Sequence, residues 1–252
     1  EAVKRIVSVV PVEADGSVYF QAPAGRALYF QLLDEHYRAL HTMRSFAGVL
    51  PGERRACTGC HESRHTAPSG RPFGTALGRP ATDLTLPPWG QENIGFERFV
   101  QPVLNRYCGA CHQGDGEARK TFDMTLRPAT GPFKDYPFTE PYLTLVGPAS
   151  WPVAVPDEGQ AGYGFAGLFP VYGLGQEDTA SGVGTGPGNP VAVTLATLLP
   201  GRALSVNSPL IRRAMGGEHH GVTVDPLSLR RLIAWVDANG PYRGDEEVRA
   251  LA

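Results

Sequence analysis

The sequence predicts an α+β protein in which a small N-terminal β-sheet or sandwich precedes a loop-rich region with few short helices. Two observations carry this prediction. Residues 1–50 hold short apolar runs separated by turn-forming residues, which is the pattern of short strands. The chain also has 31 Gly and 23 Pro among its 252 residues, a composition that favours turns and irregular segments over long helices.

The N-terminal sheet is expected to have four or five short strands. Asp15-Gly16 predicts a hairpin turn, and Asp34–Tyr37 predicts a second turn. A sheet of this size is only marginally stable alone, so we expect it to pack against another part of the protein. The predicted strands are Ile6–Val10, Val18–Phe20, Ala27–Leu33 and Ala39–Arg44.

A five-residue pattern, C-x-x-C-H, occurs twice and contains all four cysteines of the chain. It is the attachment signature of a c-type haem. Two thiols on one tight turn can each add to a haem vinyl group, and the histidine that follows can bind the iron. We therefore expect two covalently attached haem c groups, bound by Cys57, Cys60, His61, Cys108, Cys111 and His112.

Other uses of paired cysteines explain the pattern less well. Zinc sites built from two C-x-x-C pairs usually space them by about 15–20 residues, whereas about 47 residues separate Cys60 from Cys108. Zinc also gives no reason for a histidine after both pairs. A thioredoxin-like pair needs a βαβ context, which neither motif has. A disulfide framework would not confine its cysteines to C-x-x-C pairs.

Two predicted helices flank the second motif. The first runs into Cys108 and carries apolar residues at helical spacing from Phe96 to Tyr107, although Pro102 should kink or restart it. The second begins at Asp225-Pro226, a suitable N-cap and first position, and ends at Asn239-Gly240-Pro241. A helix entering C-x-x-C-H and a final helix packed across it form the plan of a small cytochrome c.

Three segments follow from these assignments. Residues 1–52 are expected to be a β domain and residues 53–90 the first haem-binding segment. Residues 91–252 are expected to be a cytochrome c-like domain with the second haem, so the whole region after the sheet is cytochrome c-like and dihaem. A Gly/Pro-rich insertion lies at about 125–205, and residues 159–188 alone contain ten Gly.

The second haem needs a ligand opposite His112, and the loop before the final helix offers candidates. They are His219, His220 and Met215. Two histidines would give a low reduction potential, and histidine with methionine a higher one. Flanking arginines are candidates for pairing with haem propionates, because guanidinium groups suit carboxylates. These arginines are Arg212, Arg213, Arg230 and Arg231.

The ligands of the first haem are less determined. His61 is the expected proximal ligand, and the opposite position is either filled by His41 or open. His36 falls in a predicted turn and is expected to be solvated unless a neighbouring chain uses it. His65, four residues beyond His61, would share a helical face with it and can act only by displacing it.

Several stretches also resemble a known family. They are Gly16–Phe20, Met43–Ser45, Pro51–Glu53, Cys57–Glu62, Val100–Leu104, Gly217–Val222 and Trp235–Asp237. In this order they resemble the carboxy-terminal dihaem part of the hydrazine synthase alpha subunit and related multihaem cytochrome c proteins. The resemblance covers most of the chain except residues 125–200.

The resemblance implies a β domain leading into the first haem, followed by a bis-histidine second haem. By position in Gly217-x-His219-x-Gly221, it favours His219 over His220. In hydrazine synthase a tyrosine four residues beyond the first motif histidine binds the iron, and the motif histidine binds zinc. The corresponding position here is His65, so the chain departs from the family at this point.

Three functions fit these features. The chain is expected to act as a dihaem c-type cytochrome that transfers electrons between redox partners, rather than as a catalyst. One alternative is a haem enzyme whose open first haem acts on a small nitrogen or oxygen species, as in hydrazine synthase or a peroxidase. The other is a subunit of a haem-stacked multimeric electron conduit.

Composition and flanking sequence limit the partners and location. The net charge of −2 indicates neither nucleic acid nor an anionic membrane surface, and no apolar run is long enough for a membrane span. Covalent haem attachment implies a periplasmic or extracellular protein. Residues 1–5 do not form a signal peptide, so we expect a processed form or fragment. Redox proteins are the expected partners, with an upstream domain or a second copy as further candidates.

Overall fold

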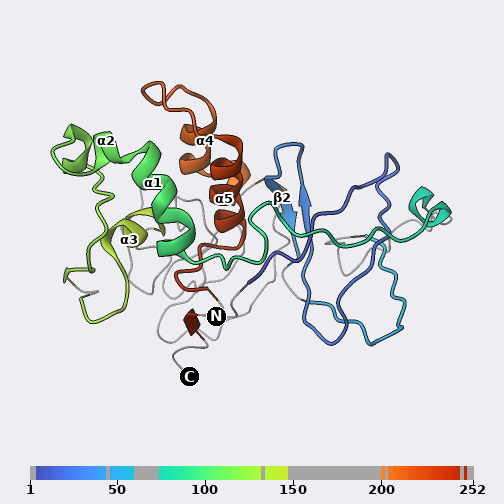
Figure 1. Ribbon diagram of the computed structural model, residues 1–252. Helices are drawn as coiled ribbons and strands as arrows, with labels where there is room; N and C mark the ends of the chain where they lie inside the picture. The colour runs from blue at the N-terminus through green and yellow to red at the C-terminus, as the bar shows by residue number, and fades with distance from the viewer. Residues whose placement is uncertain are drawn as a thin grey trace, which may run out of the picture. The chain divides into compact units, whose positions relative to one another are not determined.

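The computed structural model describes residues 4–43, 46–59, 74–131, 134–146, 200–201, 204–244 and 247–248 (Figure 1). The chain forms two compact units that alternate along the sequence. One consists of Glu1–Arg5, Leu33–His41 and Asn93–Ala252, and the other of Ile6–Leu32 and Thr42–Glu92. Short helices and one small sheet make this a loop-rich α+β protein, as the sequence predicts.

The sheet is a two-stranded antiparallel hairpin. Its strands are β1 (Gln31–Leu33) and β2 (Ala39–Thr42). The turn between them is the one predicted at Asp34–Tyr37, and Asp34 stabilises it. Its carboxylate accepts hydrogen bonds from the backbone nitrogens of His36 and Arg38, at 2.9 and 2.8 Å, and from the Arg38 guanidinium.

The remaining predicted strands differ from expectation. Among the described residues, Ile6–Val10 and Val18–Phe20 form no ladder, and only isolated bridges join Phe20 to Thr82 and Leu28 to Ala47. Short apolar runs satisfy the strand pattern whether or not a partner lies beside them. Here the partner of Phe20 comes from residues beyond the first motif, which sequence periodicity cannot reveal.

Side-chain hydrogen bonds take the place of a ladder in this unit. The turn at Asp15-Gly16 forms as predicted, with Gly16 at a φ of 81°. The Asp15 carboxylate accepts hydrogen bonds from the backbone nitrogens of Ser17 and Thr75, at 3.0 and 2.7 Å, and from both of their hydroxyls. These bonds hold the pKa of Asp15 well below its usual value, the Ser17 hydroxyl most strongly. Thr75 begins the 3-10 helix η1 (Thr75–Gly78).

The helix that leads into the second motif is interrupted at the predicted place. A π-helical turn, η2 (Phe96–Val100), is followed by α1 (Gln101–Tyr107), with Pro102 in the first turn of α1. Proline lacks a backbone N–H and is tolerated there, because the first helical nitrogens have no intrahelical acceptor. The motif then occupies α2 (Gly109–His112), and η3 (Glu117–Lys120) follows it.

The final helix has the predicted ends. In α5 (Pro226–Asp237), the Asp225 side chain caps the N-terminus by accepting from the nitrogens of Leu227 and Ser228. Asn239 and Gly240, with φ of 65° and 60°, turn the chain away at the other end, a geometry common at helix C-termini. Before α5 come η6 (Ser205–Asn207) and α4 (Pro209–Met215).

Aromatic side chains form the core between η2, α3 (Glu140–Val146) and α5. Phe96 is fully buried, and its ring centre lies 5.4 Å from Tyr142 and 5.7 Å from Trp235. The polar atoms of these rings are satisfied. Trp235 Nε1 donates to Pro241 O at 3.0 Å, and Tyr142 Oη donates to Gly240 O at 3.0 Å. This core holds the helix before the second motif against the final helix.

A buried carboxylate joins the hairpin to the final helix. Asp237 is 5% exposed, and its Oδ1 accepts from Ser205 N at 2.9 Å. Its Oδ2 accepts from Ser205 Oγ at 2.8 Å and from Ala39 N at 3.0 Å. Burial raises the pKa of Asp237 to about 7, although the hydrogen bonds favour the charged form.

None of the helices within the described ranges combines the length and apolar character needed to cross a bilayer.

Candidate functional site

The second motif forms a single helical turn, as its predicted chemistry requires. The nitrogens of Cys111 and His112 both donate to Cys108 O, at 3.2 and 3.0 Å. Cys111 is exposed, and Cys108 is half-buried. Burial raises the pKa of the Cys108 thiol to about 11, and nearby Cys111 adds to the rise. Thiol–disulfide catalysts need a lowered thiol pKa instead, so the site does not have the electrostatics of a thioredoxin-like pair.

The imidazole of His112 has a fixed tautomer. Its Nδ1 lies 2.8 Å from Phe122 O, and a carbonyl oxygen can only accept, so Nδ1 carries the proton. In the neutral ring, Nε2 therefore keeps its lone pair. A hydrogen bond from the other ring nitrogen to a carbonyl oxygen is the usual means of orienting a metal-binding histidine and raising its basicity.

His219 faces His112. The ring centres lie 6.1 Å apart and the ring planes are inclined by 22°. Two imidazoles that bind the same metal ion from opposite sides, each at about 2 Å, would have ring centres roughly 6 Å apart. The separation therefore fits a single iron between the two rings.

The pKa of His219 is lowered, first by burial and then by electrostatic interaction with neighbouring groups. These groups are His220, Arg213 and His112. A lowered pKa keeps the imidazole neutral at physiological pH, and only the neutral form can bind a metal. His219 thus has the protonation state of a ligand.

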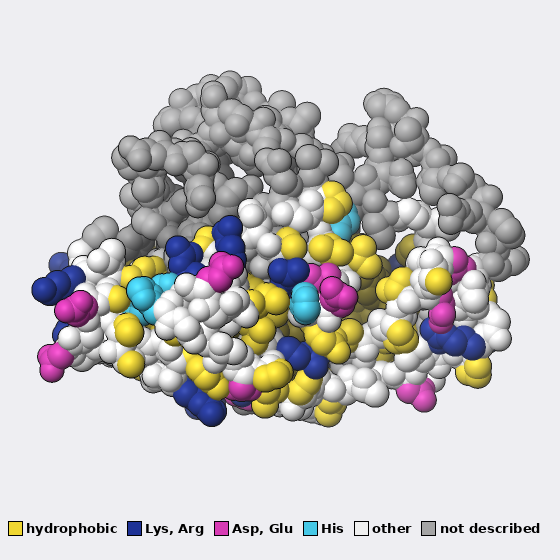
Figure 2. All heavy atoms as spheres, turned by 90° about the horizontal axis from the view of Figure 1, so that it is seen from above, with side chains coloured by type: hydrophobic (Ala, Val, Ile, Leu, Met, Phe, Trp, Pro, Cys, Tyr) yellow, Lys and Arg dark blue, Asp and Glu magenta, His cyan; other side chains and the backbone are white. Residues whose placement is uncertain are grey.

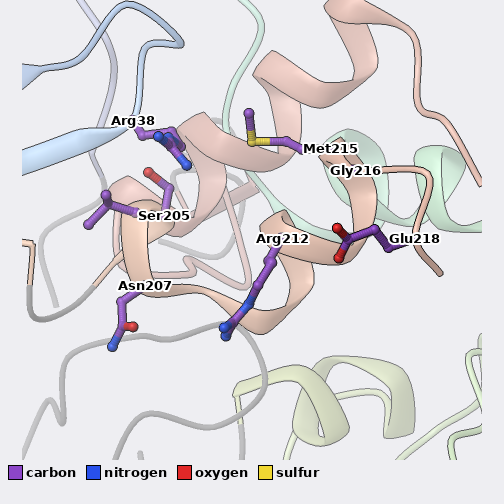
Figure 3. A pocket seen from close by; sticks show the side chains of 8 residues that line it. Arg38, Ser205, Asn207, Arg212, Met215, Gly216 and Glu218 are labelled. Atoms are coloured by element: carbon purple, nitrogen blue, oxygen red, sulfur yellow. The ribbon is translucent and has the colours of Figure 1, made fainter.

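His220 lies on the outer side of this pair. It is exposed, its φ is 52°, and its ring centre is 4.9 Å from that of His219. The other candidate from this loop, Met215, ends α4 and lines a separate pocket (Figure 3). Of the three candidates named from the sequence, His219 is the one that the structure places against His112.

The second site offers two histidines and two cysteines as donors. Within the parts of the chain that the structure describes, no group of three or more His, Cys, Asp or Glu side chains could hold a metal. A zinc site needs three or four protein ligands. A haem brings four nitrogens of its own, so His112 and His219 would complete its coordination, and Cys108 and Cys111 would supply the thiols.

The pocket that Met215 lines is polar. Its cavity volume is about 300 Å³. Figure 3 shows Arg38 reaching it from the hairpin and Arg212 from α4, with Glu218 nearby. Ligand pockets for apolar groups are lined mainly by hydrophobic and aromatic side chains. This lining is mostly polar, so the pocket does not suit a porphyrin. It is lined by Arg38, Ser205, Val206, Asn207, Arg212, Met215, Gly216 and Glu218.

Arg230 and Arg231, two of the four arginines proposed for propionates, are held by aromatic side chains. Arg231 Nε donates to Phe99 O at 3.2 Å, and its guanidinium lies 4.3 Å from the centre of the Phe99 ring. Arg230 stacks on Tyr37 at 3.6 Å. Both side chains are therefore held in contacts on other elements of the same unit.

Arg213 is the arginine whose charge acts on the histidine pair. It contributes to the lowered pKa of His219, and its Nη1 donates to Pro209 O at 3.4 Å. Figure 2 shows histidine side chains at the molecular surface, with Lys and Arg side chains close to them. Of the four arginines, Arg213 is thus the one with an electrostatic effect on His219.

The first motif is described only in part. Cys57 is exposed, whereas Cys60, His61 and His65 lie outside the described residues. The other histidine candidates are visible. His41 lies on β2 and is half-buried, and His36 is exposed in the hairpin turn as predicted. Most of the predicted insertion, residues 147–199, also lies outside the described residues.

Sequence reasoning missed two contacts that shape the second site. Tyr107, directly before the motif, donates from Oη to Asp225 Oδ2 and so ties the motif to the N-terminus of α5. Gly116 passes so close to the motif that a Cβ there would lie 2.3 Å from Cys111 O. The sequence showed Tyr107 only as part of an apolar helical pattern and Gly116 only as one of 31 glycines.

Comparison with known proteins gives one partial match. Residues 1–62 match the family model of the hydrazine synthase alpha subunit middle domain. The match covers 62 of 252 residues, about a quarter of the chain, and includes the hairpin and the first C-x-x-C-H motif. No curated protein and no solved structure matches the chain. The first quarter of the chain is thus similar to part of the hydrazine synthase alpha subunit.

Proposed function

We propose that this chain is a dihaem c-type cytochrome that transfers electrons between redox proteins in the periplasm or outside the cell. The observation that carries the proposal is the pair of His112 and His219, whose ring centres lie 6.1 Å apart beside two motif cysteines. When bound, a haem would supply a one-electron Fe(III)/Fe(II) couple.

The protein groups have defined tasks in this proposal. Cys108 and Cys111 would attach the haem covalently, while His112 and His219 would bind its iron. An iron held by two side chains would offer no position to a substrate, which favours electron transfer over catalysis at this haem. The two histidines also predict a lower reduction potential than a His/Met pair would give.

Haem stoichiometry is the first test. The denatured chain should have the mass of the polypeptide plus two haem groups, because both motifs should be occupied. Treatment with acidified organic solvent should release no haem. A mass increase of one haem, or haem that is released, would show that at least one motif does not attach its group.

Axial ligation is the second test. His219→Ala should convert one low-spin haem to a high-spin or water-ligated state. His220→Ala is the matched control, since it removes the neighbouring ring and leaves His219 in place. A spin change in His220→Ala and not in His219→Ala would show that His220, rather than His219, binds the iron.

The match to the hydrazine synthase alpha subunit supports a second candidate function for the first haem. Residues 1–62 span the first motif, so this haem is proposed as the site of chemistry on a small nitrogen species if its sixth position is open. Its proximal ligand is proposed to be His61, and the candidate for the sixth position is His41. We also propose that the chain assembles with redox partner proteins, with an upstream domain or with a second copy of itself.

Binding of carbon monoxide to the reduced protein separates the two candidates. Rapid binding at one haem in the unmodified protein would support the enzyme. No binding, with binding gained in His41→Ala, would support the electron carrier. His65→Ala serves as the control for the departure from the family pattern, and a spectral change in that variant alone would contradict ligation by His61.

A further inference from the structure

The segment after the second motif returns along it and binds His112 twice. Phe122 O accepts the hydrogen bond from the ring, at 2.8 Å from Nδ1. Met124 N donates to the backbone oxygen of His112 at 2.9 Å. The ring and the main chain of His112 are therefore both fixed by Phe122–Met124.

Amide side chains hold this segment from the other side. Gln113 Nε2 donates to Met124 O at 2.8 Å, and Gln101 Nε2 donates to the same oxygen at 3.0 Å. Both Nε2 groups also donate to Asn105 Oδ1, at 2.6 and 2.7 Å respectively. Two amides, Gln101 from α1 and Gln113 directly after the motif, thus donate to the backbone oxygen of Met124, and Asn105 links the two.

The orientation of these amides follows from the backbone. Met124 O can only accept, so Gln101 and Gln113 must both present their NH2 groups to it. Asn105 must then present its oxygen to the same NH2 groups. Gln101 is 1% exposed, and its Oε1 has no hydrogen-bond partner among the described residues. Rotating that amide would place Oε1 against two other acceptors, so the orientation described is the favourable one.

Gln113 also lies against the motif turn itself. A Cβ built on Gly109, between the two motif cysteines, would lie 2.8 Å from Gln113 Oε1. The side chain of Gln113 therefore packs over the motif while its NH2 group holds Met124. It connects the turn that carries the cysteines with the segment that orients His112.

From these contacts we infer that Gln113 is a positioning residue for His112, acting through the backbone of Phe122–Met124. The inference rests on the proposed function, in which His112 binds iron. A hydrogen bond from Nδ1 to a carbonyl raises the basicity of Nε2 and stabilises the ferric state. Gln113 strengthens that bond by holding Phe122 O in place, and so lowers the reduction potential of the second haem.

A purely structural role for Gln113 predicts something different. In that case its loss would lower the free energy of unfolding but leave the potential and spectrum of the folded protein unchanged. The positioning role predicts a change at one haem only. The two roles can therefore be separated in a folded variant.

The test uses the full chain with both haems and the variant Gln113→Met, which keeps the length of the side chain without its donor. We expect the reduction potential of one haem to rise in a redox titration. The low-spin electron paramagnetic resonance signal of the same haem should also change. The backbone amide of Met124 should exchange its hydrogen faster. Gln21→Met is the matched control, because Gln21 Nε2 makes a comparable 2.8 Å bond to Asp83 in the other unit.

Two results would overturn the inference. One is faster exchange at Met124 with an unchanged potential and spectrum, which is the structural outcome. The other is an equal shift in Gln21→Met. If Gln113→Met does not fold, Asn105→Ala, at an exposed position, should produce a smaller rise in the same potential, and an unchanged potential there would refute the inference.

If the proposed function is wrong, the unmodified protein will lack a low-spin haem whose spectrum changes in His219→Ala. If that haem is present and Gln113→Met leaves it unaltered, only the role of Gln113 is wrong.

Discussion

The stability of this protein should depend on the ionisation of Asp237. Burial raises its pKa from 3.8 to about 7. Between these values the unfolded chain has released the proton while the folded chain retains it, so the free energy of unfolding falls as pH rises from about 4 to 7. A rise of about 3 pKa units corresponds to a loss of ~4 kcal/mol.

The variant Asp237→Asn isolates this effect from all other titrating groups. Asparagine resembles the protonated carboxyl, because its oxygen can accept from Ser205 N and its NH2 can donate to Ser205 Oγ. Ala39 N keeps Ser205 Oγ as an acceptor at 3.2 Å. The stability of the wild type relative to the variant should therefore fall between pH 4 and pH 7 and remain level above pH 7.

Denaturant unfolding followed by far-ultraviolet circular dichroism, at steps from pH 4.5 to pH 8, measures this difference. The hydrogen bonds from Ser205 and Ala39 favour the carboxylate, and their effect opposes burial. If they dominate, the wild type will gain stability over Asp237→Asn as pH rises. That result, or a difference independent of pH, would refute the reasoning.

Further predictions concern the core and the second motif. Phe96→Ala should lower the free energy of unfolding by about 3–5 kcal/mol, because the ring is fully buried, as measured by denaturant unfolding. Gly116→Ala should reduce haem attachment at the second motif, read by intact mass, since its Cβ would meet Cys111 O. Gly78→Ala, which has open space around it, should leave both haems attached. Asp225→Ala should lower stability through loss of the α5 cap and the Tyr107 bond, and a thermal midpoint equal to that of the wild type would contradict this.

Local sequence signals predicted the helical ends well. The Asp225-Pro226 start of α5, its end at Asn239-Gly240 and the restart at Pro102 all depend on residues within one turn. The turn at Asp34–Tyr37 is similar, since Asp34 binds the backbone of its own loop. Such features are visible in sequence because their partners are neighbours.

Features that depend on distant partners could not be predicted. The expected strand at Ile6–Val10 has the right residues, but the structure gives it no ladder within the described ranges. In the second site, the motif and His219 were named from the sequence, whereas the role of Phe122 O was not. No local pattern indicates which backbone oxygen will return to His112, ten residues earlier.

The bonds from Asp237 to the hairpin have a consequence for how the protein folds. Ala39 N and Asp237 are 198 positions apart, and Lys4 Nζ donates to Ala238 O across 234 positions. Contacts of such separation form slowly, and a chain made from its N-terminus presents the hairpin long before α5 exists. Both C-x-x-C-H motifs are synthesised in that interval, since they precede α5 in the chain. A fragment beginning at residue 91 would lack the hairpin altogether and would leave Asp237 without the Ala39 donor.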